Sequence, residues 1–527
     1  MRVLPLENDA VNECWISDKD RFSYEALDSA ERLTQPMLKQ GGEWKEVDWQ
    51  TALEYVAHGL KNIKHEHGAD AIASYATPHS TTEELHLLQK LTRALGSEHV
   101  DFRLRQSDFA LDGEVKPWLG MPIADVTALQ RVFVIGSFLR KDHPLLATRI
   151  RAAVKSGAKL SVLNATADDS LITVANQIVA APSDWLAALS EVVAAVAAAK
   201  EVAAPAGFEG INASDAAKGI AASLLSGERK AVFMGNAAAA HPQASALHAA
   251  AQWIAEQTGA KLGYLVDAAN TVGGYLVNAT AKNAAPAFSA PKKAYLLLNA
   301  EPELDAANPQ AAAAALQQSD MVVVMSAFKH GMDYADVLLP VAPFSETSGT
   351  FVNAEGRAQS FNGTVKPLAE ARPAWKVLRV LGNILGLSGF DYDTSEAIRD
   401  ELFGKGVTDL SARLNNLPKV AGGALERLAD VPIHFADALA RRSGPLLATV
   451  DGAAPVARIS AATAAALGIK AGDQVSVTQG SGSAVLPAVI DAGLAANVVR
   501  VPAAHASTAK LGAMFGAITV AKAGEAK

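Results

Sequence analysis

The chain has 527 residues, of which 50% are hydrophobic and 19% are charged. This composition is typical of globular proteins and excludes a disordered or membrane-embedded chain, and at roughly 150 residues per domain the length allows about three or four domains. The 47 basic and 55 acidic side chains leave a net charge of −8, which disfavours nucleic acid as a partner because it repels phosphate. The single cysteine, Cys14, cannot by itself form an internal disulfide or hold an iron–sulfur cluster.

The sequence predicts no signal peptide and no membrane span. Glu7, Asp9 and Glu13 interrupt the first fifteen residues, where a signal peptide needs an unbroken apolar run. The most apolar stretch is Trp185–Ala199, which is shorter than the ~20 residues needed to cross a hydrocarbon core. We therefore expect a cytoplasmic chain without a transmembrane helix.

The first sixty residues hold short elements, and Glu43–Trp49 leads into a helix with Asp48 as the expected N-cap. Three βαβ patterns follow over 131–164, 231–266 and 293–326, each with two β-branched runs around an Ala/Leu-rich helix. Short apolar runs joined by helices are typical of parallel sheet that is covered by helices on both faces. The middle of the chain is therefore predicted to be α/β and doubly wound.

The remaining segments depart from this pattern. Glu201–Ser226 is rich in alanine, glycine and small polar residues and is predicted to form a surface loop. From Arg441 onward, a period-two pattern interrupted by glycines predicts a small antiparallel β-barrel, whose main strands are preceded by one helix over Ala461–Leu467.

Common catalytic signatures are missing from the sequence, which has no GxSxG elbow, no Walker A loop and no GxGxxG motif. His65 and His67 indicate a solvated helix end rather than a metal site. His143, His241 and His330 each follow an apolar strand, where α/β folds bind ligands, and capping of a neighbouring helix is the alternative role for each.

The densest polar segment is Phe328–Leu378, which includes the predicted buried strand Val337–Pro340. It carries an alternating array of acids, amides and guanidinium groups: Glu346, Asn353, Glu355, Arg357, Gln359, Glu370 and Arg372. The arginines and Asn353 could grip phosphate or pterin groups of a large cofactor, with Gly356 allowing the backbone to turn. Alternatively, Glu355, Arg357, Glu370 and Arg372 pair with one another and fix a long loop.

This polar segment also resembles a known family. The molybdopterin oxidoreductase superfamily has a signature similar to ADVLLPVAPFSETSGTFVNAEGRAQ (335–359) and the following EARPAW (370–375). Leu33–Leu53 resembles the entry to the first α/β region of that superfamily, and Ile459–Ile490 resembles its final β-barrel domain. The resemblance implies an α/β fold: a molybdopterin-oxidoreductase-like body with parallel βαβ units and a C-terminal β-barrel domain like the one that binds the dinucleotide form of the cofactor.

Two further stretches point to one branch of the superfamily. Arg2–Leu27 and His99–Phe109 resemble the G subunit of bacterial NADH:quinone oxidoreductase, respiratory complex I. In full-length members of that branch, a ferredoxin-like region with cysteine clusters precedes this part. The resemblance therefore implies the C-terminal portion of the G subunit, with 1–30 as a remnant of the iron–sulfur subdomain, 31–440 as the α/β body and 441–527 as the C-terminal β-barrel domain.

The chain departs from catalytic members of the superfamily at two ligand positions. The last cysteine of their cluster-binding quartet corresponds to Ser17, and Cys14 lies three residues earlier, so the resemblance implies a lost cluster. Their molybdenum ligand follows a Val-Asp pair, and the register of Val100 and Asp101 places Ser107 at that position. Serine is a molybdenum ligand in some branches, and a surface or helix-cap role is the other interpretation of Ser107.

The resemblance implies a structural module of complex I, which oxidises NADH, passes electrons over FMN and iron–sulfur clusters to quinone and translocates protons. The chain itself is expected to bind no cofactor or metal and to hold no catalytic residue, with Asn353, Glu355, Gly356 and Arg357 as remnants of a cofactor cleft. Its expected partners are other peripheral-arm subunits and the missing ferredoxin-like region, at the cytoplasmic face of the inner membrane. The alternative is an independent molybdopterin-dependent oxidoreductase of the formate-dehydrogenase type, with Ser107 as the metal ligand.

Overall fold

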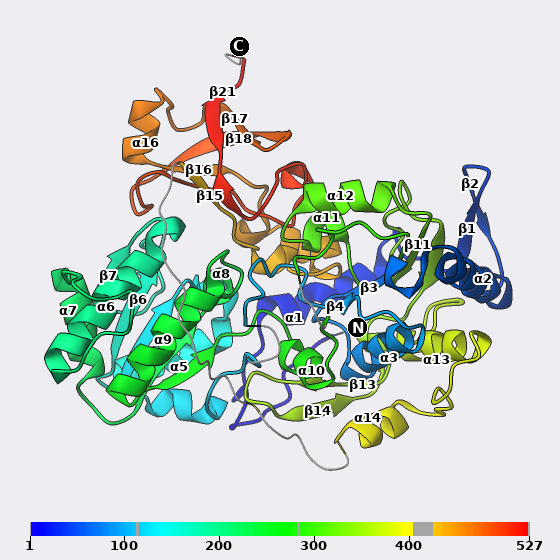
Figure 1. Ribbon diagram of the computed structural model, residues 1–527, viewed down its shortest axis with the longest axis horizontal. Coiled ribbons are helices and arrows are strands. Elements are labelled where there is room, and N and C mark those ends of the chain that lie inside the picture. The colour runs from blue at the N-terminus through cyan, green and yellow to red at the C-terminus, as the bar shows by residue number, and fades with distance from the viewer. Residues whose placement is uncertain (1, 112–114, 282–284, 404–409, 411–424, 525–527) are drawn as a thin grey trace.

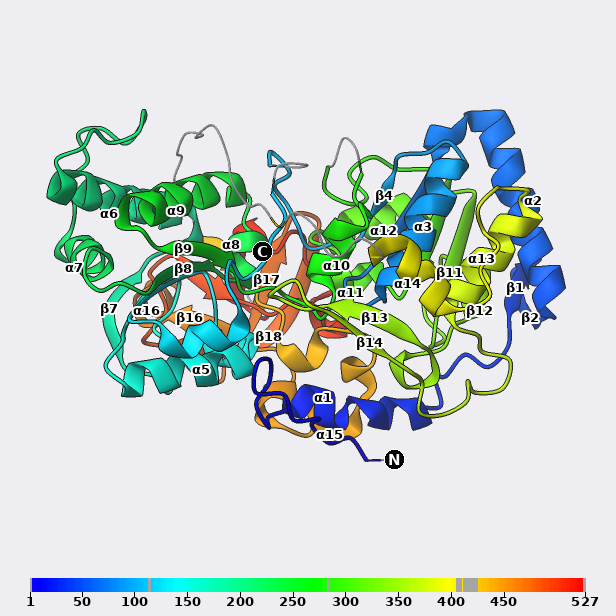
Figure 2. The ribbon, with the colours of Figure 1, turned by 90° about the horizontal axis from the view of Figure 1, so that it is seen from below.

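The structure, a computed structural model, describes residues 2–111, 115–281, 285–403, 410 and 425–524. Figure 1 shows two α/β lobes side by side and a β-rich unit that projects above them toward the C-terminus. The N-terminal segment holds α1 (Asp18–Phe22), which packs against α15 (Gly444–Leu447), as Figure 2 shows from below. Ser443 Oγ donates to Phe22 O at 2.8 Å, so the N-terminal segment is fixed to a part of the chain that follows both lobes in sequence.

The first lobe is built on a seven-stranded sheet in the order β2-β1-β12-β11-β10-β3-β4. Its strands are β1 (Met37–Gln40), β2 (Glu43–Glu46), β3 (Ile72–Ala76), β4 (Val100–Asp101), β10 (Ala294–Leu298), β11 (Met321–Ser326) and β12 (Val337–Pro340). The strands from β12 to β4 are parallel, and the β1–β2 hairpin adds antiparallel strands at one edge. The third predicted βαβ pattern and the predicted strand Val337–Pro340 are confirmed in this sheet.

Helices bury both faces of this sheet, which explains why its central strands are apolar throughout. One face is covered by α2 (Trp49–His67), α3 (Thr82–Ala94) and α13 (Ala374–Ile384), and the other by α12 (Pro309–Gln317). Short helices α10 (Thr271–Leu276), α11 (Pro302–Asp305) and α14 (Ser395–Phe403) complete the lobe. The predicted N-cap is confirmed, since Asp48 Oδ1 accepts a hydrogen bond from Thr51 N at 2.8 Å.

The second lobe is built on a five-stranded sheet in the order β7-β6-β5-β8-β9, and all of its strands are parallel. The strands are β5 (Arg131–Ile135), β6 (Lys159–Asn164), β7 (Val174–Val179), β8 (Lys230–Met234) and β9 (Lys261–Tyr264). The first two predicted βαβ patterns are confirmed here. The three patterns therefore divide between two sheets, which their similar sequences do not reveal.

Helices also cover both faces of the five-stranded sheet. They are α5 (Pro144–Lys155) on one face and α6 (Trp185–Lys200), α7 (Asp215–Leu224) and α9 (Ala244–Thr258) on the other, with α4 (Leu139–Asp142) and α8 (Asn236–Ala239) after β5 and β8. The outer edge of β9 is covered by an irregular segment, because Tyr264 N donates to Trp118 O at 2.7 Å. A Cβ atom at Gly263 would lie 1.9 Å from Leu119 O, so only glycine permits this close approach.

The predicted loop Glu201–Ser226 is wrong in its second half, which forms α7. Ser214 caps this helix by accepting a hydrogen bond from Ala217 N at 3.3 Å. Ile220 and Leu224 are buried against α6, and the small residues between them allow the two helices to approach closely. The small residues that indicate a loop by composition here serve helix packing instead.

One segment among the described residues, Pro182–Lys200, is long and apolar enough by length and composition to cross a membrane. It contains α6, and the side chains of Trp185, Leu189, Val192 and Val196 are fully buried in the core of the second lobe. Core helices of globular proteins pass the same test, so the apolar character of α6 is explained by its packing.

The C-terminal unit is a curled seven-stranded sheet, a half-barrel, in the order β20-β15-β19-β16-β18-β17-β21. Its strands are β15 (Glu426–Leu428), β16 (Ala457–Ser460), β17 (Gln474–Gln479), β18 (Gly482–Asp491), β19 (Val498–Arg500), β20 (Phe515–Ala517) and β21 (Thr519–Lys522). The predicted helix is confirmed as α16 (Ala461–Ala466), but the sheet is mixed rather than antiparallel, because β15 pairs with β19 and β16 with β18 in parallel. Strand β15 also lies before residue 441, where the period-two pattern begins.

Candidate functional site

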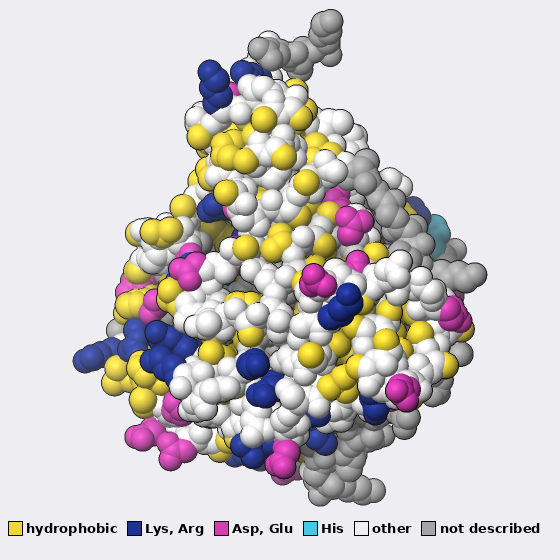
Figure 3. Space-filling model, turned by 90° about the vertical axis from the view of Figure 1, so that its left-hand side faces the viewer, with side chains coloured by type: hydrophobic (Ala, Val, Ile, Leu, Met, Phe, Trp, Pro, Cys, Tyr) yellow, Lys and Arg dark blue, Asp and Glu magenta, His cyan; other side chains and the backbone are white. Residues whose placement is uncertain are grey.

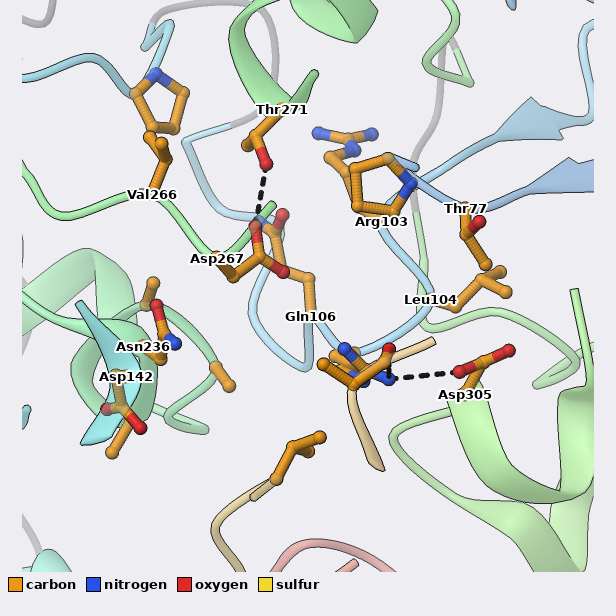
Figure 4. Close-up of a pocket in the computed structure, with 18 of the residues that line it drawn as sticks. Thr77, Arg103, Leu104, Gln106, Asp142, Asn236, Val266, Asp267, Thr271 and Asp305 are labelled. Atoms are coloured by element: carbon orange, nitrogen blue, oxygen red, sulfur yellow. Dashed lines mark hydrogen bonds and ion pairs between the residues drawn. The ribbon is translucent and has the colours of Figure 1, made fainter. Parts of the chain in front are cut away.

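A cavity of about 140 Å³ lies where the carboxyl ends of the parallel strands of the two lobes face each other (Figure 4). Residues that follow β3 and β4, such as Thr77 and Leu104, line it from the first lobe, and Asn236 after β8 and Val266 after β9 line it from the second. The C-terminal unit closes it through Ala429–Val431. This is the position at which α/β sheets bind ligands.

The two arginines that reach this cavity are each paired with a carboxylate. Arg103 Nε and Nη2 donate to the Asp101 carboxylate at 2.9 and 2.7 Å. Arg105 Nη2 donates to Asp305 Oδ1 at 2.9 Å and to Ala436 O at 2.9 Å. Charge-assisted pairs of this kind neutralise the guanidinium groups within the chain, so neither arginine is left to bind an anion.

Asp305 belongs to a larger buried network that joins the first lobe to the C-terminal part of the chain. Arg441 Nη1 donates to Glu301 Oε2 at 2.8 Å, and Arg441 also pairs with Asp305. Arg442 Nη1 lies 2.6 Å from Glu301 Oε1. Burial alone would raise the pKa of Asp305, but the charges of Arg441 and Arg105 hold it below its ordinary value. The network therefore stays ionised and fixes the turn at 440–442 to the first lobe.

Toward the second lobe, the cavity is lined by Phe138 and Asp142 of that lobe and by Asp430 of the C-terminal unit. Arg500 Nη2 donates to Asp430 Oδ2 at 2.9 Å, and its guanidinium lies 3.7 Å from the centre of the Phe138 ring. Asp142 Oδ2 accepts a hydrogen bond from Phe138 N at 3.0 Å, and burial raises the pKa of Asp142 to about 7. Asp142 thus exchanges a proton near neutral pH.

A second cavity of about 280 Å³ adjoins the first and shares three lining residues with it: Thr77, His79 and Asp305. Its lining is mostly apolar and includes Phe328, Phe344 and Phe351. At its margin Lys19 Nζ lies 2.8 Å from Asp437 Oδ2, so this cation is also paired. Among the described residues, His79 Nε2 is buried without a hydrogen-bond partner, and burial lowers the pKa of this imidazole.

The residues around the two cavities do not fit a molybdopterin dinucleotide. Its phosphates need cations that are free to bind, whereas Arg103, Arg105 and Lys19 are already paired, and Asp267 adds a carboxyl group to the lining. In the part of the chain that the structure describes, no group of three or more His, Cys, Asp or Glu side chains could hold a metal ion.

The predicted remnants of a cofactor cleft, Asn353, Glu355, Gly356 and Arg357, form the turn between β13 (Gly349–Val352) and β14 (Ala358–Phe361) and line neither cavity. Asn353 Oδ1 accepts hydrogen bonds from the amides of Glu355 and Arg357 at 3.1 and 3.0 Å. Arg357 Nε donates to Glu355 Oε1 at 2.7 Å. Gly356 has φ +87°, which favours glycine in this tight turn.

The carboxylate of Glu355 also binds the second lobe, since Glu355 Oε2 accepts a hydrogen bond from Ile123 N at 2.7 Å. Other members of the array pair outside it: Glu346 accepts two bonds of 2.9 Å from Arg32 Nη2, and Arg372 lies over the Trp49 ring at 4.9 Å. These contacts fix the loop through partners in other elements, and among the described residues only the Glu355–Arg357 pair is of the kind that the second interpretation predicts.

The two serines at expected ligand positions lie in different surroundings. Ser17 caps α1: its Oγ accepts from Asp20 N at 3.1 Å and donates to Asp20 Oδ2 at 2.6 Å. Cys14 is exposed. Ser107 lies half-buried in an irregular segment between β4 and the second lobe, outside any helix, and it lines neither cavity. A helix-cap role for Ser107 is therefore wrong.

The three histidines after strands line neither cavity. His241 Nε2 lies 3.0 Å from Pro182 O, and His330 Nε2 lies 2.9 Å from Ala300 O. His143 occupies the N-cap position of α5, but its side chain makes no capping hydrogen bond. Burial lowers the pKa of His143 and of His241 to about 4, so both are neutral core residues at pH 7.

Sequence reasoning missed the charged residues that do line or brace the cavities: Arg103, Arg105, Asp305, Asp437 and Arg441. One signal was present, because Asp101, Arg103 and Arg105 alternate with apolar residues, although the short strand β4 at which they begin was not predicted. Charges at this spacing after a strand indicate side chains at the sheet edge that need partners. The partners of Arg105 lie 200 or more residues away and leave no local pattern.

Three family models match the chain: molybdopterin oxidoreductase over 32–384, the molydopterin dinucleotide binding domain over 431–525, and the NADH-ubiquinone oxidoreductase NDSU1/NuoG-like 4Fe-4S domain over 1–25. A relative from Streptomyces coelicolor, the G subunit of NADH-quinone oxidoreductase, is 28% identical over 92% of this chain and 63% of its own length. The mitochondrial NADH-ubiquinone oxidoreductase 78 kDa subunit of Neurospora crassa is 25% identical over 82% of this chain and 54% of its own length. The chain therefore spans less than two thirds of these relatives.

A putative formate dehydrogenase from Staphylococcus haemolyticus is 31% identical, but over only 31% of this chain and 17% of its own length. The acetylene hydratase of Pelobacter acetylenicus has the same fold, with a TM-score of 0.69 over 96% of this chain and 94% of its own, at 16% identity. The predicted resemblance to the G subunit is confirmed by its relatives, and the predicted α/β body with a C-terminal β-barrel-like domain is confirmed by the sheets and the two larger family matches. This chain belongs to the molybdopterin oxidoreductase family.

Proposed function

We propose that this chain is a structural part of the G subunit of an NADH:quinone oxidoreductase and carries no redox centre of its own. One observation carries this proposal: the cations at the former cofactor cleft are paired with carboxylates of the same chain, as Arg103 is with Asp101 and Arg105 with Asp305. A cleft that neutralises its own charges binds no polyphosphate cofactor but joins the surrounding elements firmly. The relative from Streptomyces coelicolor, a G subunit by name, supports the same assignment.

In this role the chain supports a complex that oxidises NADH, passes electrons over FMN and iron–sulfur clusters to quinone and translocates protons. Its proposed partners are the other peripheral-arm subunits and a ferredoxin-like region, at the cytoplasmic face of the inner membrane. Cys14 is the single cysteine, so a cluster with four thiolate ligands would need the other ligands from another polypeptide segment. The remnant at 1–30, the body at 31–440 and the C-terminal unit at 441–527 remain the proposed division of the chain.

The proposal is tested by isolating the chain with an affinity tag from membranes of its own host. We expect the other subunits to co-purify in fixed ratio, together with NADH:quinone activity and iron. The chain produced alone is expected to hold no iron or molybdenum by elemental analysis. Recovery of the tagged chain without other subunits, or stoichiometric metal in the isolated chain, would contradict the proposal.

A second candidate is an independent molybdopterin-dependent oxidoreductase of the formate-dehydrogenase type, which the partial match to the Staphylococcus haemolyticus protein favours. In that case Ser107 would be the metal ligand and the Asn353–Arg357 turn would contact the cofactor. The two candidates are separated by denaturing the purified protein and measuring the fluorescence of released, oxidised pterin. Release of pterin supports the second candidate, and its absence together with co-purifying subunits supports the first.

A further inference from the structure

A row of cations lies at the amino ends of the five-stranded sheet, opposite the edge that faces the cavity. The first residues of four neighbouring strands form this cation row: Lys159 of β6, Arg131 of β5, Lys230 of β8 and Lys261 of β9. Arg131 is the direct partner of both Lys159 and Lys230, and Lys261 pairs with the residue after Lys230. Adjacent strands lie about 4.8 Å apart, so Lys159, Arg131 and Lys230, which are in register, present their charges on one face at this spacing, whereas Lys261 is offset by one residue and leaves from the opposite face.

Three further cations flank the row: Arg151 and Lys155 on α5 and Arg229 before β8, all of them exposed. Figure 3 looks onto this end of the molecule and shows Lys and Arg side chains gathered toward its left. Glu228 and Asp125 are acids in the adjoining segments. Among the described carboxylates, however, none forms an ion pair with the row or with the three flanking cations.

The hydrogen bonds of the row leave its charge uncompensated. Arg131 Nε donates to Ser226 Oγ at 2.8 Å and Arg131 Nη1 to Gln130 O at 2.7 Å, and both acceptors are neutral. Lys159 and Lys261 are exposed, whereas Arg131 and Lys230 are half-buried. The partly covered stems restrict where the charged ends can lie, which lowers the entropy cost of pairing them with a partner.

Helix dipoles explain only part of this arrangement. The carboxyl ends of α5 and α9 point to the same edge, and a cation in the last turn of a helix, such as Lys155, is stabilised there. That effect falls off within one turn and accounts for one cation at each helix end. It does not explain why the first residues of four successive strands are all basic.

We propose that the cation row is the docking surface for an acidic helix of a partner protein. A helix with carboxylates at i and i+4 presents one about every 5.4–6 Å, close to the spacing of the strands, so a helix laid across the strands would place its carboxylates against successive cations. Among the described residues, the large hydrophobic side chains that are exposed lie outside the row. The row therefore offers nothing to insert into a bilayer or to stack on a base, which favours protein over lipid or nucleic acid.

This inference goes beyond the proposed function, because it names a surface and the chemistry of its partner. The proposed function and the docking surface would be contradicted by different results. If the proposed function is wrong, the wild-type chain recovers no other subunits. If the docking surface is wrong, the wild-type chain and the variant described below recover the same subunits in the same amounts.

The direct test is zero-length cross-linking of the complex isolated with the tagged chain. A carbodiimide joins a lysine amine to a carboxylate that touches it, forming an amide with loss of water. We expect peptides that link Lys159, Lys230 or Lys261 to a glutamate or aspartate of a partner subunit. Links from these lysines only to carboxylates of the same chain would overturn the inference.

A charge-reversed variant gives the second test. Lys155→Glu, Lys159→Glu and Lys261→Glu change three exposed side chains, and the matched control reverses Lys45, Lys64 and Lys470, which are exposed on other parts of the molecule. The probe is a synthetic alanine-based helix with glutamates at i, i+4 spacing, and its glutamine counterpart serves as the blank. Binding at low salt is expected to weaken about tenfold or more in the variant and less than twofold in the control, since reversing charges at a complementary surface adds repulsion.

The same proteins are then compared for other ligands. Equal binding of the acidic helix by variant, control and wild type would overturn the inference. Binding of phosphatidylglycerol vesicles or a single-stranded oligonucleotide that is tighter than binding of the helix, and lost in the variant, would also overturn it. Recovery of one partner protein reduced about tenfold with the variant, but not with the control, supports it.

Discussion

The charged side chains at the two ends of the five-stranded sheet differ: those at one end form ion pairs, and most of those at the other end are exposed. At the carboxyl ends of its strands, Arg500 pairs with Asp430, and the facing arginines of the first lobe are paired as well. At the amino ends, Lys159 and Lys261 stand exposed, with no ion pair to a described carboxylate. A buried charge without a partner costs several kcal/mol, whereas an exposed one is stabilised by water. The charges at the carboxyl ends of the strands are therefore used within the chain, whereas those at the amino ends remain available to a partner.

The largest effect is expected from opening the closed end. Arg441→Met leaves Glu301 and Asp305 without one of their cations, and removing one member of a buried charge network costs about 3–5 kcal/mol. The free energy of unfolding of the isolated chain, measured in urea, should fall by this amount, while Lys45→Met serves as an exposed control. A loss below about 1 kcal/mol would mean that the network contributes little to closing the cleft.

A smaller effect is expected from replacing Asp142, and here the variant should be more stable than the wild type. Burial raises its pKa to about 7 in the folded chain, so folding favours the protonated acid and stability falls as the pH rises from about 4 to above 7. Asp142→Asn keeps an acceptor for Phe138 N and removes the charge. The variant should exceed the wild type in stability by about 1–3 kcal/mol at pH 8, with a difference that shrinks toward pH 4. Parallel pH profiles would contradict this account.

The contribution of His143 to stability should change with pH in the direction opposite to that of Asp142. Burial lowers its pKa to about 4, below the ordinary value of 6.5, so its contribution to stability is present above pH 6.5 and is lost as the pH falls toward 4. His143→Gln should remove this loss, and the variant should lose about 1–2 kcal/mol less than the wild type between pH 7 and pH 4. Denaturant titrations of variant and wild type at four or five pH values measure this change in the free energy of unfolding. A variant as acid-sensitive as the wild type would show that His143 is not the responsible group.

The smallest effect is expected at the open end of the sheet. Lys159→Ala combined with Lys261→Ala should change the free energy of unfolding by less than about 0.5 kcal/mol, because both side chains are exposed and unpaired within the described chain. Thermal and urea unfolding of the isolated chain measure this. A loss above about 1 kcal/mol would indicate that the cations serve the helix ends rather than a partner.

Local patterns were sufficient to predict the parallel strands, because a run such as Tyr295–Leu298 between turn signals has few other conformations that bury it. The patterns could not assign strands to sheets, since nothing within β8 or β10 distinguishes one parallel sheet from another. Helix α7 was missed because small residues that pack against α6 have the same composition as a loop. The parallel pairs of the C-terminal sheet were missed because period two is common to both directions.

The candidate site was harder to predict than the fold. Its defining pairs join residues far apart in sequence, as Arg105 and Asp305 do, and only the folded chain brings them together. The Asn353–Arg357 turn was identified as a polar cluster from its residues, but its hydrogen bonds to itself and to Ile123 depend on the fold. The family resemblance pointed to Asn353–Arg357, which line neither cavity, and both the position of the cavities and the charges around them required the structure.

The covered edge of β9 has a consequence for how the molecule behaves at high concentration. Tyr264 N already donates to Trp118 O, and the absence of a side chain at Gly263 lets the backbone of Leu119 lie directly on the strand. Another chain therefore cannot extend the sheet from that side, because the backbone of 118–120 occupies the place at which a further strand would pair. A single glycine in this way protects one flank of the lobe against strand-to-strand aggregation.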